Sequence, residues 1–128
     1  LDMGCGTGVL GIMAKKCGAK QVVAVDIDDK SVNNTLENAQ ANNVELDVCL
    51  GSTPPDGEYD LILANIHRNI LIDHMPAYAN NLKAGSELWL SGFYEEDITY
   101  LTRAAEQVGL KHIQTRSQNE WRWLRFTN

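Results

Sequence analysis

The stretch of sequence that decides the fold is Leu1-Asp2-Met3-Gly4-Cys5-Gly6-Thr7-Gly8, at residues 1–8. It predicts the tail of a strand over Leu1 to Met3, then a glycine turn, then a helix over Thr7 to Cys17. Glycine permits a tight turn and lets the backbone approach a ligand closely. The first amides of a helix have no partner inside it, so they are free to bind a polar group. By itself, this loop indicates only a nucleotide-like ligand.

Strand and helix patterns alternate along the rest of the chain. Gln21 to Val25 is a largely apolar run of the kind expected for a strand buried on both faces. Alternation of this kind predicts a parallel sheet with helices on both faces. The further predicted elements are a helix capped by Asp29 or Ser31 and running to about Asn42, strands over Val44 to Leu50 and Tyr59 to Ala64, a helix from about Ile70 to Leu82 closed by Lys83, Ala84 and Gly85, a strand over Glu87 to Ser91, and a helix over Glu95 to Val108.

The chain finishes with two consecutive strand-like runs. These are Leu110 to Thr115 and Glu120 to Phe126, joined by the polar turn Ser117-Gln118-Asn119. A closing hairpin predicts one antiparallel strand inserted into the parallel sheet. A length of 128 residues is enough for one domain with one sizeable core, so residues 1–128 are predicted to form one domain.

Composition excludes several classes of protein. The net charge of −6 argues against a general phosphate-binding surface, so no DNA partner is expected, and it suits a cationic partner better. No apolar run approaches the roughly 20 residues that span a bilayer, so no membrane association is expected. The three cysteines lack metal-ligand spacing, which argues against a disulfide framework or a metal site and suits a reducing cytoplasm. Each cysteine is interpreted as a small buried hydrophobic residue.

Two cofactors compete for the glycine loop. Gly6-Thr7-Gly8-Val9-Leu10-Gly11 matches the dinucleotide pattern G-x-G-x-x-G, which favours NAD. That match requires the strand to run to Cys5, whereas Gly4 already interrupts it, and it leaves Asp2 unexplained. A carboxylate near the end of a central strand is costly unless it meets a positive charge or several donors. The ammonium and sulfonium groups of S-adenosylmethionine would supply that charge, so Asp2 favours this cofactor.

A second acid follows at the expected distance. Asp26 ends the next predicted strand roughly 20 residues beyond the glycines, where an acidic side chain can accept both ribose hydroxyls of a nucleoside. The alternative for Asp26 and Asp28 is a helix cap. We favour the ligand interpretation for Asp26, and the two interpretations are equally balanced for Asp28.

These motifs resemble those of a known family. Asp2-x-Gly4-x-Gly6-x-Gly8 and Val25-Asp26-Ile27-Asp28 resemble motifs I and II of the class I methyltransferases. The resemblance implies a Rossmann-like α/β fold: a mostly parallel seven-stranded sheet with an antiparallel C-terminal hairpin strand and helices on both faces. It implies S-adenosylmethionine as cofactor, held by Asp2, Gly4, Cys5, Gly6, Thr7, Gly8, Asp26, Ile27, Ser52 and Asn65.

A narrower resemblance is to the PrmA-type methyltransferases of a ribosomal large-subunit protein. It rests on Leu63-Ala64-Asn65-Ile66, Leu90-Ser91-Gly92 with Glu95-Glu96, and Lys83-Ala84-Gly85-Ser86. The resemblance implies a cytoplasmic enzyme that methylates amino groups, a lysine side chain or an N-terminal amine, of a ribosomal large-subunit protein. It also implies a separate upstream domain for substrate recognition, which we expect to lie outside residues 1–128. Oligomeric state is left open.

Asn65 is the candidate catalytic residue. Methyltransferases of planar nitrogens typically carry Asn-Pro-Pro-Tyr or Asp-Pro-Pro-Tyr at this point, whereas here the run is Asn65-Ile66-His67-Arg68. A planar acceptor therefore loses support and an aliphatic amine gains it. We expect Asn65 to hold the amine or the methionine end of the cofactor, with a helix cap as the alternative. Where many relatives place an acid facing adenine, Ser52 stands in this chain.

The remaining candidates are weaker. His67 is expected to be exposed and idle. Phe93 and Tyr94 are candidates to line an acceptor pocket, with core packing as the alternative for Phe93, and Trp121 and Trp123 are interpreted as core residues. Other functions stay open at this point: a methyltransferase of RNA or of a small amine, a module that binds S-adenosylmethionine without catalysis, and an NAD-binding dehydrogenase domain.

Overall fold

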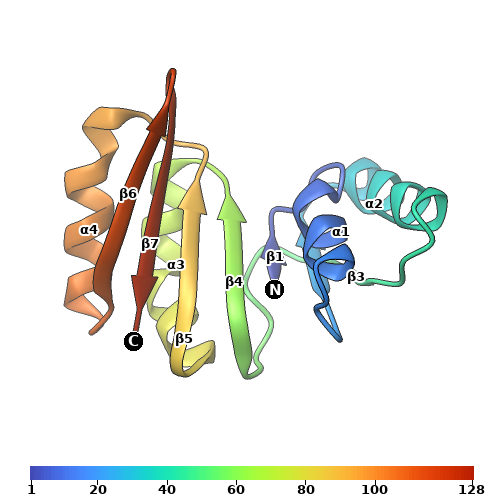
Figure 1. The fold of residues 1–128 in the computed structure, drawn as a ribbon, viewed down its shortest axis with the longest axis horizontal. Helices are drawn as coiled ribbons and strands as arrows, with labels where there is room; N and C mark the ends of the chain where they lie inside the picture. Colours follow the sequence, from blue (N-terminus) through green and yellow to red (C-terminus); the bar gives the residue numbers. More distant parts are fainter. The chain divides into compact units, whose positions relative to one another are not determined.

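The computed structural model describes all of the chain, Leu1–Asn128, and divides it into two compact units. The first unit is Leu1–Thr53 and the second is Pro54–Asn128; each is described by itself (Figure 1). The first contains β1 (Asp2–Met3), α1 (Val9–Lys16), β2 (Val23–Asp26), α2 (Asp29–Ala41) and β3 (Asp47–Leu50). The second contains β4 (Tyr59–Asn65), α3 (Arg68–Asn81), β5 (Leu82–Ser91), the 3-10 turn η1 (Glu95–Asp97), α4 (Ile98–Gln107), β6 (Lys111–Gln118) and β7 (Trp121–Thr127).

The strands of the first unit are parallel, as predicted. In β1 and β2, Met3 pairs with Val25, and in β2 and β3, Asp26 pairs with Leu50. β2 has a neighbouring strand on each side, and Ala24 and Val25, which point to opposite faces of the sheet, are both almost fully buried, so both faces are covered there. Parallel pairing brings the carboxyl ends of the three strands to one edge, so the glycine loop after β1 and the acid at the end of β2 meet there.

The second unit combines a parallel pair with the predicted antiparallel hairpin. β4 runs parallel to β5, β7 is antiparallel to β5, and β6 is antiparallel to β7. Alternate residues of β5 and β7 are fully buried, as period-two side-chain alternation requires for the covered face of a sheet. These are Leu88, Leu90, Leu124 and Phe126, and the buried apolar residues of the two helices are Leu71, Met75 and Tyr78 in α3 and Leu101 and Ala105 in α4.

Two boundaries in the first unit differ from the prediction. Helix α2 is capped by Asp28, whose side chain accepts from the Lys30 amide at 3.2 Å, and not by Asp29 or Ser31. Strand β3 begins at Asp47 and not at Val44. The Val44 amide donates to the Ala39 carbonyl oxygen at 3.0 Å, across a residue at φ 55, so this segment closes α2.

In the second unit, the predicted helix stop lies within a strand. Helix α3 begins at Arg68 and ends at Asn81, and β5 starts at once with Leu82. Lys83-Ala84-Gly85 therefore belongs to β5. Gly85 has φ +76, and the pairing with β4 shifts register between Tyr59↔Leu82 and Leu61↔Glu87, so the glycine serves an irregularity of the strand.

The C-terminal segment also departs from the prediction in detail. The predicted helix from Glu95 starts only at Ile98, because η1 precedes it and the Asp97 carboxylate accepts from the Tyr94 amide at 2.9 Å. The hairpin strands run to Gln118 and from Trp121, which leaves a shorter turn with Asn119 at φ 56.

Several side chains predicted to be buried are not. Trp121 is 68% exposed at the tip of the hairpin and Trp123 is half-buried, so the core assignment is wrong for Trp121. Cys5 is buried, whereas Cys17 and Cys49 are exposed, one after the end of α1 and one on the sparsely covered strand β3. None of the helices combines the length and apolar character of a membrane span.

Candidate functional site

The glycine loop between β1 and α1 wraps over the end of β2. The amides of Gly4 and Cys5 both donate to the Val25 carbonyl oxygen, at 2.7 and 3.0 Å. Gly4, Gly6 and Gly8 have φ of 74°, 55° and 83°. A side chain is strained in this left-handed region, which explains glycine at these positions. Gly8 is also the N-cap of α1, and having no side chain it leaves the helix start without a side-chain cap.

Asp2 lies beneath this loop and is 1% exposed. Its Oδ2 accepts a hydrogen bond from the Gly11 amide, in the first turn of α1, at 2.9 Å. A Cβ at position 11 would lie 3.1 Å from that same oxygen, so glycine permits the close approach. Burial raises the pKa of Asp2 to about 6 and outweighs the opposing effect of the Gly11 amide. A buried carboxylate with so little compensation is favourably placed for a cation.

Asp26 links the end of β2 to the glycine loop. Its Oδ2 accepts from the Gly6 amide at 2.9 Å, and its Oδ1 accepts from the Asp28 amide at 3.0 Å. These two bonds fix the carboxylate, which stays partly exposed. Because each carboxylate oxygen has a second lone pair, both can still accept from a ligand hydroxyl. The structure therefore brings together the glycine loop, Asp2 and Asp26, as the sequence predicted.

The edge of the first unit beside Asp26 carries exposed apolar groups. Ile27 is 73% exposed and Leu50 is 57% exposed, and Leu50 pairs with Asp26 across β2 and β3. Ser52 is exposed in the segment that follows β3. Exposed aliphatic side chains at the carboxyl ends of strands can pack against a flat ring of a bound ligand.

Two residues of α2 that the sequence prediction missed also contact the loop. Thr35 is fully buried, and its Oγ1 lies 3.0 Å from the Gly6 carbonyl oxygen and 3.3 Å from Cys5 Sγ. One turn later, Asn38 Nδ2 donates to the Thr7 carbonyl oxygen at 2.8 Å. The only sequence signal for these two residues is that Thr35 is a polar residue at a core-facing position of the helix and that Asn38 follows it by three residues.

Asn65 belongs to the second unit and is described there by itself. It is the exposed last residue of β4 and pairs with Ser91 of β5. The N-cap position of α3 is taken by His67, so the helix-cap alternative for Asn65 is wrong. A Cβ at position 92 would lie 2.6 Å from Asn65 Oδ1, so Gly92, at φ +85, leaves room for this side chain.

The other candidate residues near Asn65 in the sequence differ in how exposed they are. His67 is exposed, as predicted, and makes no side-chain cap. Phe93 is 6% exposed and packs in the core, whereas Tyr94 is 69% exposed. No group of three or more His, Cys, Asp or Glu side chains is arranged to hold a metal ion.

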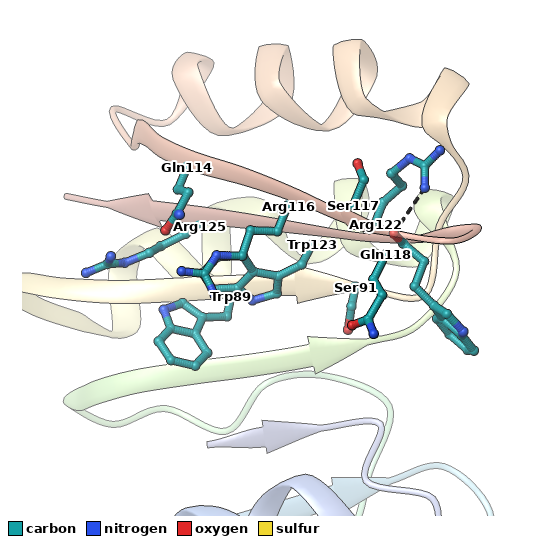
Figure 2. Close-up of a pocket in the computed structure, with 10 residues that line it drawn as sticks. Trp89, Ser91, Gln114, Arg116, Ser117, Gln118, Arg122, Trp123 and Arg125 are labelled. Atoms are coloured by element: carbon teal, nitrogen blue, oxygen red, sulfur yellow. Dashed lines mark hydrogen bonds between the residues drawn. The ribbon is translucent and has the colours of Figure 1, made fainter.

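A separate cavity of about 700 Å³ opens on the second unit and contains none of the predicted cofactor residues. Figure 2 shows its tryptophan and arginine side chains on the strands β5, β6 and β7. Arg122 pairs with Glu95 at 2.8 Å, Arg125 pairs with Glu87, and the Arg116 guanidinium lies over the Trp123 ring, 5.6 Å from its centroid. Most of its arginine charge is thus already engaged within the chain.

Comparison with known proteins identifies the family. The family model described as ribosomal protein L11 methyltransferase (PrmA) matches residues 1–128. A protein of Porphyromonas gingivalis named ribosomal protein L11 methyltransferase is 53% identical over 131 residues, covering 99% of this chain and 45% of that relative. The chain therefore spans about half the length of this curated relative.

Solved structures agree on the fold. A ribosomal protein L11 methylase from Lactobacillus delbrueckii subsp. bulgaricus superposes with a TM-score of 0.95 at 31% identity, covering 99% of this chain and 68% of that one. An S-adenosylmethionine-dependent methyltransferase from Clostridium acetobutylicum gives a TM-score of 0.80 at 14% identity, covering 98% and 82%. These likenesses confirm the predicted Rossmann-like class I methyltransferase fold, with its mostly parallel strands and antiparallel hairpin. Because the family model matches the whole chain, the chain belongs to the ribosomal protein L11 methyltransferase (PrmA) family.

Proposed function

We propose that this chain is the cofactor-binding, catalytic domain of a protein methyltransferase. It transfers methyl groups from S-adenosylmethionine to amino groups, a lysine side chain or an N-terminal amine, of a ribosomal large-subunit protein. The name of the relatives, ribosomal protein L11 methyltransferase, supports a ribosomal protein as the acceptor. An acceptor of this kind implies that the enzyme acts in the cytoplasm. The observation that carries the proposal is the Asp26 carboxylate fixed by the Gly6 amide, in a chain that the family model matches throughout.

The residues present fit S-adenosylmethionine. A Cβ built on Gly6 meets nothing within 4 Å, so the loop has open space on that side for a ligand. Asp26 would accept the ribose hydroxyls, and the negative charge of Asp2 would favour the cationic methionine end. The exposed side chain of Ile27 would contact the adenine ring, with Ser52 as a further polar contact. The backbone of Gly4, Cys5, Thr7 and Gly8 would complete the loop around the cofactor.

The chain's own task is to bind, orient and exclude water. When bound, S-adenosylmethionine supplies an electrophilic methyl group and a thioether leaving group. A lysine amine with a pKa near ~10.4 is protonated at neutral pH, and an α-amine near ~8 partly so. The site must therefore favour the neutral amine. We propose that the Asn65 side-chain oxygen accepts an N–H of that amine, which orients its lone pair.

Binding of S-adenosylhomocysteine, measured by calorimetric titration with NAD as comparison, tests the cofactor. Asp26→Asn should weaken binding at least tenfold, because the amide group presents donors where the carboxylate accepts from Gly6 and Asp28. Asp29→Asn is the matched control, since Asp29 is exposed at the start of α2. Tighter binding of NAD than of S-adenosylhomocysteine would contradict the proposal.

Transfer of labelled methyl groups tests the acceptor. The chain is incubated with labelled S-adenosylmethionine and either purified ribosomal protein L11 or ribosomal RNA, and the label is located by mass spectrometry. We expect label on amino groups of the protein and none on RNA, and a reduced rate of methyl transfer for Asn65→Ala. Label on RNA alone would overturn the proposed acceptor and leave the cofactor assignment standing.

A further inference from the structure

Two side chains of α2 hold consecutive carbonyl groups of the glycine loop. Thr35 Oγ1 lies 3.0 Å from the Gly6 carbonyl oxygen, and Asn38 Nδ2 lies 2.8 Å from the Thr7 carbonyl oxygen. The residues are three apart, so they project from the same side of the helix. A hydroxyl has one hydrogen to donate, and a carbonyl oxygen is a far better acceptor than sulfur. The Thr35 hydroxyl therefore donates to the Gly6 carbonyl oxygen, and its own oxygen faces the Cys5 thiol.

These contacts determine where the neighbouring amide points. The peptide group that joins Gly6 to Thr7 is planar and trans, so its N–H points away from its C=O. With the Gly6 oxygen held toward α2, the Thr7 N–H points away from α2. Thr7 is exposed, and its amide has no acceptor within the chain. The contact from Thr35 therefore fixes an unused backbone donor in a single direction.

The methyl group of Thr35 supports the loop as well. A Cβ at position 8 would lie 2.8 Å from Thr35 Cγ2, so this methyl already fills the space under Gly8. Thr35 thus contacts the loop through two different groups, a hydroxyl at Gly6 and a methyl at Gly8. The side chain is fully buried, so it cannot itself touch a ligand.

We propose that Thr35 and Asn38 are positioning residues of the cofactor site: they turn the Gly6 and Thr7 carbonyls toward α2 and aim the Thr7 amide at the bound cofactor. The proposal rests on the proposed function, because it assigns these residues to the S-adenosylmethionine site. In their absence the loop samples other peptide orientations, and binding must then select the competent one, which weakens the apparent affinity.

Substitutions can distinguish the role of the Thr35 hydroxyl from the role of its methyl group. Thr35→Val keeps the shape and a methyl but removes the hydroxyl, whereas Thr35→Ser keeps the hydroxyl and removes the methyl. Asn38→Ala removes the second contact, and Asn34→Ala is its control, because Asn34 is an exposed residue one turn earlier on the same helix. Affinity for S-adenosylhomocysteine is measured by titration at a temperature where thermal unfolding shows every variant to be folded.

We expect Thr35→Val and Asn38→Ala each to weaken binding about tenfold, with Thr35→Ser and Asn34→Ala within about twofold of the unsubstituted chain. Rescue by serine is the readout that a purely structural role would not produce. If Thr35→Val does not fold, Asn38→Ala against Asn34→Ala carries the test alone. Unchanged affinity in folded Thr35→Val or Asn38→Ala, or an equal loss in Thr35→Ser and Thr35→Val, would overturn the proposal. If the unsubstituted chain itself fails to bind, the proposed function fails instead.

Discussion

Asp2 shows how one buried carboxylate links stability to ligand binding. It is 1% exposed, and its Oδ2 accepts a hydrogen bond from the Gly11 amide. One amide does not offset the loss of hydration of a full charge. The folded chain therefore holds Asp2 in an unfavourable state at neutral pH. Such a cost is expected where a residue is kept for its charge and not for stability, which agrees with the role toward a cationic ligand that we propose for Asp2.

The first prediction concerns pH. Burial raises the pKa of Asp2 from 3.8 to about 6, so between these values the folded state binds more protons than the unfolded state. This extra proton binding stabilises the folded state, and the stabilisation is present in full below pH 3.8 and is lost as pH rises through about 6. Its contribution to the unfolding free energy should fall by about 3 kcal/mol over this range.

Asp2→Asn removes this titration while keeping an oxygen that can accept from Gly11. Urea unfolding at pH 4, 5, 6 and 7 should show the unfolding free energy of the variant rising relative to that of the unsubstituted chain across the range. Asp29→Asn, at an exposed position, controls for a general charge effect and should show no such trend. A constant difference at all four pH values would contradict the pKa shift.

Gly92 provides a second prediction at the residue scale. A Cβ there would lie 2.6 Å from Asn65 Oδ1 and 2.9 Å from the Ile66 amide nitrogen. Gly85 has a similar backbone, φ +76 against +85, but open space around it. Gly85→Ala should therefore cost about 1 kcal/mol of unfolding free energy, from backbone strain alone.

Gly92→Ala adds a steric clash to that strain. It should cost at least about 1–2 kcal/mol more than Gly85→Ala, and it should lower methyl transfer because it displaces Asn65. Urea unfolding measures the first effect and the labelled-methyl assay the second. Equal stability of the two variants would show that the Asn65 side chain moves aside freely.

At the scale of the elements, local signals predicted where most helices and strands occur but misplaced their ends. Gly85 was interpreted as a helix stop because glycine commonly follows a helix. The structure uses it inside β5, since pairing with β4 continues to Tyr59↔Leu82 and holds the chain extended there. The Asn43-Val44 segment was assigned to a strand, although the Val44 amide closes α2. Each error arises where tertiary pairing or a backbone contact overrides a local preference.

The candidate site was predictable where its residues are close to the glycine motif or end a strand. The loop and Asp26 meet because parallel strands end at one edge, which the alternating pattern already indicates. Thr35 and Asn38 reach the loop across sequence separations of 29 and 31 residues. The sequence marks Thr35 only as a polar residue at a core-facing position of α2 and does not specify which group it contacts there, so these contacts required the structure.

Helix α2 supplies a prediction at this scale. Asp28 caps it by accepting from the Lys30 amide, and the next residue, Asp29, makes no such cap. Asp28→Ala should lower the unfolding free energy by about 1 kcal/mol, and Asp29→Ala by less than half of that. Chemical denaturation at pH 7 compares them. An equal loss would indicate that the general negative charge near the helix start, and not the capping bond, is responsible.

At the scale of the whole molecule, the two units differ in what they contribute. The glycine loop, both acids and the two loop contacts from α2 belong to Leu1–Thr53, whereas Asn65 belongs to Pro54–Asn128. A ligand that binds the folded chain and not the unfolded one stabilises it by mass action. Cofactor binding is therefore measurable as stability, independently of any methyl transfer and before an acceptor is identified.

This gives the last prediction. S-adenosylhomocysteine at 100 times its dissociation constant should add about 2.7 kcal/mol to the unfolding free energy, which corresponds to a rise in Tm of about 10 °C for a chain of this size. The effect should grow with the logarithm of ligand concentration. At the same ligand concentration it should fall to about 1.4 kcal/mol or less in Asp26→Asn, whereas Asp29→Asn should retain it in full. NAD at the same concentration should leave Tm unchanged. The shift in Tm depends on binding alone, so its absence would count against the cofactor site itself. A full shift in Tm without methyl transfer would mean that residues 1–128 bind the cofactor. Productive contact with the acceptor would then require more than this chain.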